Sequence, residues 1–298
     1  MNQAYWIKKG INNYQRLIGI GNWLVTLGCG DIAFAINQLS RYNAAPREGH
    51  LTLLIRVFEY LNTRPNKLIV TKGQTYPRFL LELDHKRMSA PGDMFPLYKD
   101  TEFEDLPKAP NPLGKSVEIN IFVDASHGDN QQDKKTTTGL LIFIGDIHYK
   151  VKSKRQKCVA TSTFSAEFMA LRYAYEEGMS VKFLFQSLGV PISGKINIYS
   201  DNKSILDSSV IPGIDLSRKH VAISFHTVRE AYAHDVISLH WISGSDNPAD
   251  FLTKALGNII YEKHSNRIFG SIKLIKERFK EVLKEKRKKD NSKKKKNN

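Results

Sequence analysis

The chain has 298 residues, of which 41% are hydrophobic and 10% aromatic, enough to build a packed core. No apolar run approaches the roughly 18 residues of a membrane span, and the first residues lack the apolar segment of a signal peptide, so we expect no membrane association. The net charge is +15. Residues 1–116 hold 15 Lys and Arg against 10 Asp and Glu, residues 117–257 hold 15 against 15, and residues 258–298 hold 15 against 5. Basic flanks around a neutral block suit a polyanionic partner.

Residues 12–62 have the apolar spacing of helices. The first extends to about Gly28, and Asp31 is an N-cap candidate for a second over IAFAINQLSRY. A break at Ala45-Pro46 precedes a third amphipathic segment, HLTLLIRVFEYLN. A plain helical bundle and three helices packed on a nucleic-acid duplex both agree with this pattern.

Residues 67–72 and 79–85 have strand-like composition, and proline then becomes frequent up to Pro112. Such a segment is typical of a linker, so we expect a domain boundary near residue 116. The two cysteines, Cys29 and Cys158, are far apart in the sequence and are expected to be buried free thiols.

From residue 117 the pattern alternates between strands and helices. Three strands are expected first, with a hairpin turn at Gly145-Asp146, and then a long helix over about 162–188. A strand INIYSD, a short helix NKSILDSS, a helix HVAISFHTVREAYAH, a strand VISLHWIS and a final helix NPADFLTKAL follow. This order predicts an α/β fold with a mixed sheet and helices on its faces.

Four acidic residues fall at corresponding places in this pattern. Asp124 and Asp201 stand where predicted strands end, Glu167 lies in the first turns of the long helix, and Asp250 lies in the last predicted helix. Ligand sites of α/β sheets collect at strand ends, so these carboxylates are expected to converge. Carboxylates at close range stay ionised only with a cation among them, and Mg²⁺ or Mn²⁺ prefers such oxygens. The pattern indicates two-metal phosphodiester chemistry.

Residues 117–256 resemble the ribonuclease H domain of copia-type retrotransposon Pol polyproteins. The matching segments are VDASHGDNQQDKKTTTGLLIFIG, KSKRQKCVATSTFSAEFMAL, IYSDNKSIL, RKHVAISFHTVRE and NPADFLTKAL, in that order. The resemblance implies a ribonuclease H-like mixed five-stranded sheet. It also implies that Asp124, Glu167, Asp201 and Asp250 bind two divalent ions and cleave RNA endonucleolytically in an RNA–DNA hybrid.

The first part of the chain is similar to the segment that follows the reverse-transcriptase palm in the same polyproteins. In that family an Arg-Pro commonly precedes the Asp-Ile, whereas Cys29-Gly30 stands here, and no Tyr-x-Asp-Asp of a polymerase occurs anywhere. We therefore expect no polymerase activity. The implied partners are the hybrid and the upstream reverse-transcriptase palm and integrase of the same element, in cytoplasmic virus-like particles or in the nucleus.

The expected organisation has four parts. Residues 1–73 form a helical region like a reverse-transcriptase thumb or connection, residues 74–116 a Pro-rich linker, residues 117–257 the ribonuclease H-like domain, and residues 258–298 a basic helix, SIKLIKERFKEVLKEKRK, with a disordered Lys-rich tail.

Further residues are candidates for contacts with nucleic acid. Ser126 and Asn202 each follow one of the acids and could donate hydrogen bonds to the hybrid, while Lys154 and Arg155 form a basic strand edge. A lysine-protected, solvated edge strand is the competing explanation for that edge. The loop Ser243 to Asn247 lacks the histidine that cellular ribonucleases H carry there, and His240 in the preceding strand is expected to be structural.

Two other functions remain open. The chain could be an inactive or repurposed element remnant that only binds nucleic acid, which its basic ends and missing palm suggest. It could also be an integrase-like nuclease, but the acids of that class usually run Asp, Asp, Glu. Here the glutamate comes second, which favours ribonuclease H.

Overall fold

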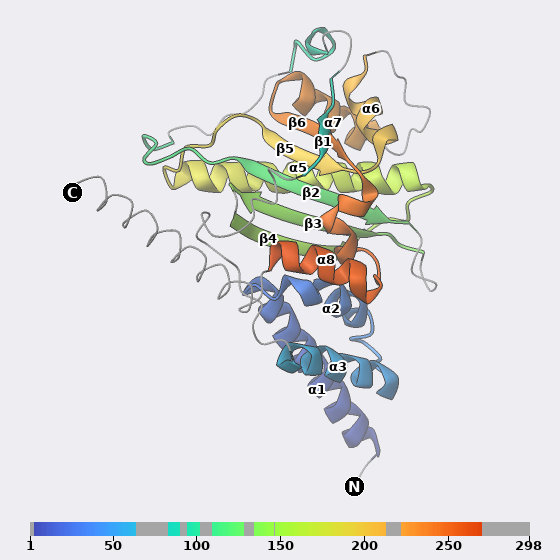
Figure 1. Ribbon diagram of the computed structural model, residues 1–298. Helices are drawn as coiled ribbons and strands as arrows, with labels where there is room; N and C mark the ends of the chain where they lie inside the picture. The colour runs from blue at the N-terminus through green and yellow to red at the C-terminus, as the bar shows by residue number, and fades with distance from the viewer. Residues whose placement is uncertain are drawn as a thin grey trace, which may run out of the picture.

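A six-stranded mixed sheet in the order β1-β6-β5-β2-β3-β4 forms the centre of the protein (Figure 1). The computed structural model describes residues 3–63, 83–89, 94–101, 109–127, 134–145, 147–212 and 222–269. The strands are β1 (His85–Arg87), β2 (Ile119–Ser126), β3 (Thr137–Ile144), β4 (Ile147–Arg155), β5 (Ile196–Ser200) and β6 (Ile237–Ile242).

The pairing of the strands confirms the predicted α/β class and the mixed sheet with helices on its faces. β2, β3 and β4 are antiparallel neighbours, β5 runs parallel to β2, and β6 runs parallel to β5. The sheet has six strands rather than the predicted five. The additional strand is β1, which comes from before residue 117 and pairs antiparallel with β6.

Three helices cover one face of the sheet. They are α5 (Thr163–Ser187), α6 (Lys203–Val210) and α7 (Ala222–Ala233). Helix α5 begins at an N-cap, Ser162, whose side chain accepts a hydrogen bond from the Ser165 backbone N–H at 3.2 Å. Its apolar side packs on Ile121 and Val123 of β2 within the largest core cluster. Every residue of β2 is buried because both faces of this central strand are covered.

The opposite face is covered first by two elements between residues 248 and 268 and then by the amino-terminal helices. The 3-10 helix η5 (Pro248–Leu252) and helix α8 (Asn258–Ile268) pack on this face through Phe251 and Ile268. Below them lie α1 (Gln3–Thr26), η1 (Gly30–Ile32), α2 (Ala33–Ser40) and α3 (Glu48–Thr63), as Figure 1 shows. These helices bury a core cluster of their own around Tyr14 and Leu54. Two short 3-10 helices, η2 (Phe95–Leu97) and η4 (Gly244–Asp246), complete the described elements.

Specific polar contacts join the amino-terminal helices to the sheet region. The Tyr60 hydroxyl donates to Asp31 Oδ2 at 2.8 Å and lies 3.0 Å from the Tyr261 hydroxyl of α8. Gly30 lies so close to β4 that a Cβ there would stand 2.6 Å from Val151 Cγ2. A residue with a side chain at position 30 would therefore collide with Val151 and Phe269 at this seam.

Several local predictions need correction. NPADFLTKAL contains a 3-10 helix and not an α-helix. Asp31 does not cap α2: it lies within η1, the N-cap residue is Ile32, and the cap makes no side-chain bond. Both cysteines are free, as predicted, but Cys158 is exposed and Cys29 only half-buried. Helix α8 lies where no helix was predicted.

Some predicted segments fall outside the described residues, namely the strand over 67–72, most of 79–85, and SIKLIKERFKEVLKEKRK with the Lys-rich tail. None of the described helices is long and apolar enough to cross a membrane.

Candidate active site

Four carboxylates from four elements meet at one edge of the sheet. Asp124 lies in β2, Glu167 in α5, Asp250 in η5, and Asp201 directly follows β5. The pairing of Phe122 with Tyr199, continued two residues along the parallel strands, sets Asp124 beside Asp201. One carboxylate oxygen from each of the three aspartates lies within 4.8 Å of the others. The three aspartates therefore converge as predicted, and Glu167 lies near enough for the charges of Asp124 and Asp201 to raise its pKa, although it is outside this group of three.

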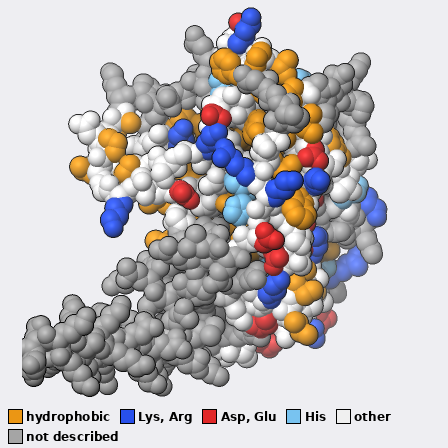
Figure 2. Space-filling view, turned by 45° about the horizontal axis from the view of Figure 1, so that its top comes forward, with side chains coloured by type: hydrophobic (Ala, Val, Ile, Leu, Met, Phe, Trp, Pro, Cys, Tyr) orange, Lys and Arg blue, Asp and Glu red, His pale blue; other side chains and the backbone are white. Residues whose placement is uncertain are grey.

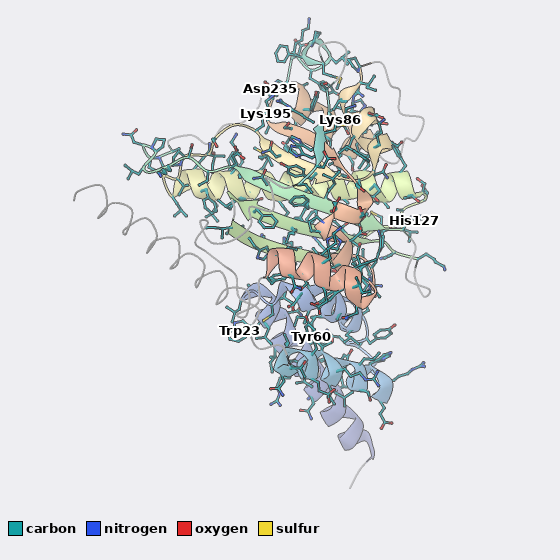
Figure 3. All side chains as sticks on the ribbon, in the orientation of Figure 1. Trp23, Tyr60, Lys86, His127, Lys195 and Asp235 are labelled. Atoms are coloured by element: carbon teal, nitrogen blue, oxygen red, sulfur yellow. The ribbon has the colours of Figure 1, made fainter. Side chains whose placement is uncertain are left out.

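The site occupies the carboxyl ends of β2 and β5. His127, labelled in Figure 3, directly follows β2 and marks this edge. Lys195 directly precedes β5 and Asp235 lies two residues before β6, so they mark the opposite edge. Parallel strands end together, which explains why residues far apart in the sequence gather here.

Two side chains that were not predicted hold the carboxylates in place. Asn247 is completely buried, and its Nδ2 donates to Asp201 Oδ1 at 3.2 Å and to the Val123 carbonyl at 3.1 Å. The Thr253 hydroxyl, also buried, contacts Asp124 Oδ2 in a short hydrogen bond. These bonds fix the orientation of two acids before any ligand arrives. Asn247 is the first residue of the NPAD motif and Thr253 follows the motif by three residues, so their position in NPADFLTKAL was the available signal.

A glycine allows η5 to lie directly on the sheet. Gly139 pairs with Asp124 across β2 and β3. A Cβ on Gly139 would stand 2.8 Å from the Ala249 carbonyl oxygen and 2.7 Å from Thr253 Cγ2. The backbone that carries Asp250 can therefore approach β2 only because residue 139 has no side chain.

The crowding of acids changes their ionisation. Burial, and next Asp250, raise the pKa of Asp124 to about 6, although Lys254 and Thr253 act in the opposite direction. Burial and then the Asp124 and Asp201 charges raise the pKa of Glu167 well above its usual value. The pKa values of Asp201 and Asp250 are also raised, chiefly by burial. The folded protein thus disfavours the simultaneous ionisation of all four groups.

The donor set fits a divalent cation. Glu167 is 6% exposed, and its Oε2 is buried with no hydrogen-bond partner among the described residues. A buried carboxylate oxygen without a donor is costly unless a cation or water satisfies it. Carboxylate oxygens alone, at this separation, are the ligands that Mg²⁺ and Mn²⁺ prefer. Asp124, Glu167, Asp201 and Asp250 would hold such ions.

Two predicted nucleic-acid contacts have other partners in the structure. Ser126 is buried at the end of β2, and its hydroxyl oxygen accepts from the Thr137 backbone N–H at 3.4 Å. Asn202 is the N-cap of α6 and accepts from the Ile205 N–H at 3.4 Å. Their roles toward a ligand stay predictions.

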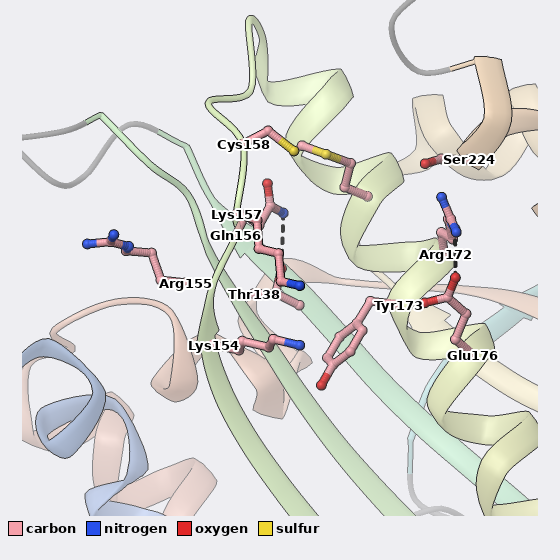
Figure 4. Close-up of a pocket in the computed structure, with 11 residues that line it drawn as sticks. Thr138, Lys154, Arg155, Gln156, Lys157, Cys158, Arg172, Tyr173, Glu176 and Ser224 are labelled. Atoms are coloured by element: carbon pink, nitrogen blue, oxygen red, sulfur yellow. Dashed lines mark hydrogen bonds and ion pairs between the residues drawn. The ribbon is translucent and has the colours of Figure 1, made fainter. Parts of the chain in front are cut away.

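The side chains of Lys154 and Arg155, the predicted basic pair on β4, point in different directions. Figure 4 shows Lys154 pointing toward Tyr173 of α5, with Arg155 pointing away from it, as strand alternation requires. The Lys154 ammonium lies 4.4 Å from the centre of the Tyr173 ring. It faces a cavity of about 210 Å³ between β4 and α5, to which Lys157 and Arg172 also contribute. On the face shown in Figure 2, Lys and Arg lie interspersed with Asp and Glu.

His240 is packed into the sheet face and does not lie among the acids. Its ring stacks on Tyr199 with centroids 4.7 Å apart, and its Nε2 lies 3.3 Å from Asn197 Oδ1. Burial lowers the pKa of His240 to about 4, so the ring is neutral at physiological pH.

Fold and site together define a mixed α/β domain with a four-carboxylate centre at the carboxyl ends of parallel strands. No family model matches the chain. It is 24% identical over 238 residues to the retrovirus-related Pol polyprotein from transposon RE1 of Arabidopsis thaliana, covering 80% of this chain and 14% of that protein. It is 31% identical over 143 residues to the corresponding polyprotein from transposon TNT 1-94 of Nicotiana tabacum, covering 48% of this chain and 11% of that protein.

The homologues of this chain are therefore retrovirus-related Pol polyproteins of copia-type transposons, and the predicted resemblance is confirmed. The chain spans about a seventh of the length of the Arabidopsis relatives. Among solved structures, the N-terminal RNase H domain of Rv2228c from Mycobacterium tuberculosis, fused to maltose-binding protein, has a TM-score of 0.35 and 13% identity. That likeness covers 51% of this chain and 98% of the other.

Proposed function

We propose that this chain hydrolyses the RNA strand of RNA–DNA hybrids endonucleolytically, with two divalent ions held by Asp124, Glu167, Asp201 and Asp250. The observation that carries the proposal is the convergence of these carboxylates, three of them with oxygens within 4.8 Å of one another. The Pol polyprotein homologues support the choice of a nucleic-acid substrate. The second place of Glu167 in the chain order of the acids favours ribonuclease H over integrase.

The chain's own residues provide a preorganised anionic centre. Asn247 and Thr253 hold Asp201 and Asp124 in fixed orientations, so little rearrangement is needed when a substrate binds. Two divalent ions bound there would activate a water and stabilise the leaving oxygen of the phosphodiester. The closely packed acids gain most from such ions because their pKa values are raised by burial and then by repulsion between the carboxylates, and bound cations would offset both effects.

The cavity beside Lys154 is a candidate contact for the hybrid backbone. Gln156 lines it and donates from Nε2 to the Ala166 carbonyl at 2.9 Å, one residue before Glu167. A phosphate bound near Lys154 would thus be close to the acidic centre. We also propose that the chain works with the polymerase palm and integrase of the same element, in virus-like particles or in the nucleus.

A cleavage assay tests the function. The full chain is incubated with a labelled RNA–DNA hybrid, single-stranded RNA, double-stranded RNA or double-stranded DNA, with Mg²⁺, Mn²⁺ or EDTA. We expect internal cuts in the RNA of the hybrid only, with either ion but not with EDTA. Asp124→Asn should abolish cutting and remain folded by circular dichroism.

Asp235→Asn is the matched control. Asp235 is an exposed aspartate at the opposite edge of the same sheet (Figure 3). Its φ of +60° suits asparagine, so this variant should cut like the wild type. Retained activity in Asp124→Asn would defeat the assignment. A wild-type chain that binds the hybrid without cutting it would instead be a nucleic-acid-binding remnant.

A further inference from the structure

Lys254 lies among the acids; it belongs to the NPADFLTKAL segment, but the sequence assigned it no role. Its Nζ is 3.0 Å from Asp250 Oδ1 and 3.7 Å from Asp124 Oδ2. Within the described ranges it is the only Lys or Arg that forms an ion pair with any of the four carboxylates. This single ammonium therefore offsets part of the negative charge of four carboxylates.

The surroundings of Lys254 leave it freer to move than the acids. Its side chain is 43% exposed, whereas that of Asp124 is 3% exposed. Asp124 and Asp201 are held by Thr253 and Asn247, whereas Lys254, within the part of the chain that the structure describes, contacts the site only through its ion pairs with Asp124 and Asp250. A lysine ammonium on a flexible stem can leave while the carboxylates keep their geometry.

Lys254 also lines a second cavity, a space of about 330 Å³ between η5, α8 and the amino-terminal helices. The lining is mainly apolar, and besides Lys254 its charged and polar residues are Asp31, Arg56, Tyr60 and Tyr261. The Lys254 side chain therefore has open space beside the acids into which it can rotate, and Asp31 offers a carboxylate there.

We propose that Lys254 is a built-in counter-cation: its ammonium holds Asp124 and Asp250 together in the ion-free protein and is displaced when a divalent ion binds. This inference rests on the proposed function, because it requires that the same carboxylates bind the ions. Lys254 is a positioning residue, and it sets the affinity for the ion by competing for the carboxylate oxygens.

The test compares Lys254→Met with Lys263→Met in the full chain. Lys263 pairs with Asp246 at 3.0 Å and is 40% exposed, so it is a matched surface pair outside the centre. Calorimetric titration with Mn²⁺ measures the dissociation constant, and thermal unfolding in EDTA measures the ion-free stability. We expect Lys254→Met to bind Mn²⁺ about fivefold more tightly, because no ammonium must be displaced. It should also unfold at a lower temperature in EDTA, and Mn²⁺ should remove that deficit.

Two further variants keep the outcome decisive. Lys254→Arg retains the charge and should keep the wild-type affinity within about twofold. Lys254→Gln should reproduce the tighter binding if the methionine variant does not fold. Unchanged or weaker Mn²⁺ binding by both neutral variants would overturn the inference, since a merely structural lysine would weaken the site on removal. Failure of the wild type to bind Mn²⁺ would instead remove the proposed two-ion function and this inference with it.

Discussion

Asp124 is predicted to destabilise the ion-free protein at neutral pH. The pKa of this carboxyl rises from 3.8 to about 6, because of burial and then the Asp250 charge. Because the folded-state pKa is raised, the neutral Asp124 carboxyl contributes fully to the free energy of unfolding below about pH 3.8. This contribution is lost as pH rises through about 6. At about 1.4 kcal/mol per pH unit, the ionised form costs about 3 kcal/mol of unfolding free energy.

Asp124→Asn removes this cost while keeping an oxygen that accepts the Thr253 hydrogen bond. In EDTA at about pH 7 the variant should therefore be more stable than the wild type by up to about 3 kcal/mol. Near pH 4 the two proteins should have similar stability, because Asp124 is then mostly neutral in the folded wild type. Activity and ion-free stability thus oppose each other at this residue.

The assay is urea unfolding in EDTA from about pH 4 to about pH 7, with Asp235→Asn as the control. Comparing the two proteins at each pH cancels the contributions of the other titrating groups. Saturating Mg²⁺ should stabilise the wild type but not Asp124→Asn, which lacks a ligand. The reasoning is refuted if the variant is less stable at pH 7, or if the difference between the proteins does not change with pH.

Two more predictions concern His148, on the sheet face covered by η5 and α8, and the contact of Gly139 with η5. His148 is buried against Phe143 and Phe269, and burial lowers its pKa from 6.5 to about 4. The neutral His148 ring contributes fully to the free energy of unfolding above about pH 6.5, and up to about 3 kcal/mol of this is lost as pH falls toward 4. His148→Phe should remove this loss when urea unfolding at about pH 5 is compared with about pH 7. An unchanged pH dependence of stability in the variant would contradict this prediction. Gly139→Ala should displace η5 and reduce cleavage about a hundredfold with the fold retained by circular dichroism. Gly49→Ala, where a Cβ meets nothing within 4 Å, is its control, and equal cleavage by the two variants would show that η5 tolerates the methyl group.

The amino-acid sequence determined most elements between residues 117 and 245 and the places of Asp124, Glu167 and Asp201 within them. The period-two and helical apolar patterns located β2 and α5, and the turn residue Gly145, which has a φ of +56°, located the β3–β4 hairpin. Asp124 and Asp201 were recognisable because a polar residue directly after an apolar strand is a local signal. Parallel strands end at a common edge, so these local signals were enough to predict that the acids meet.

Only the tertiary structure decided how the elements pack around the acids. Lys254, Asn247 and Gly139 lie in segments that the sequence singled out, but those segments did not reveal their roles, which arise from contacts between η5 and the sheet. The pairing of β1 with β6 and the docking of the amino-terminal helices on α8 likewise join segments far apart in the chain. Such contacts depend on which buried surfaces are complementary in three dimensions, and the periodicity of a single segment carries no information about its partner.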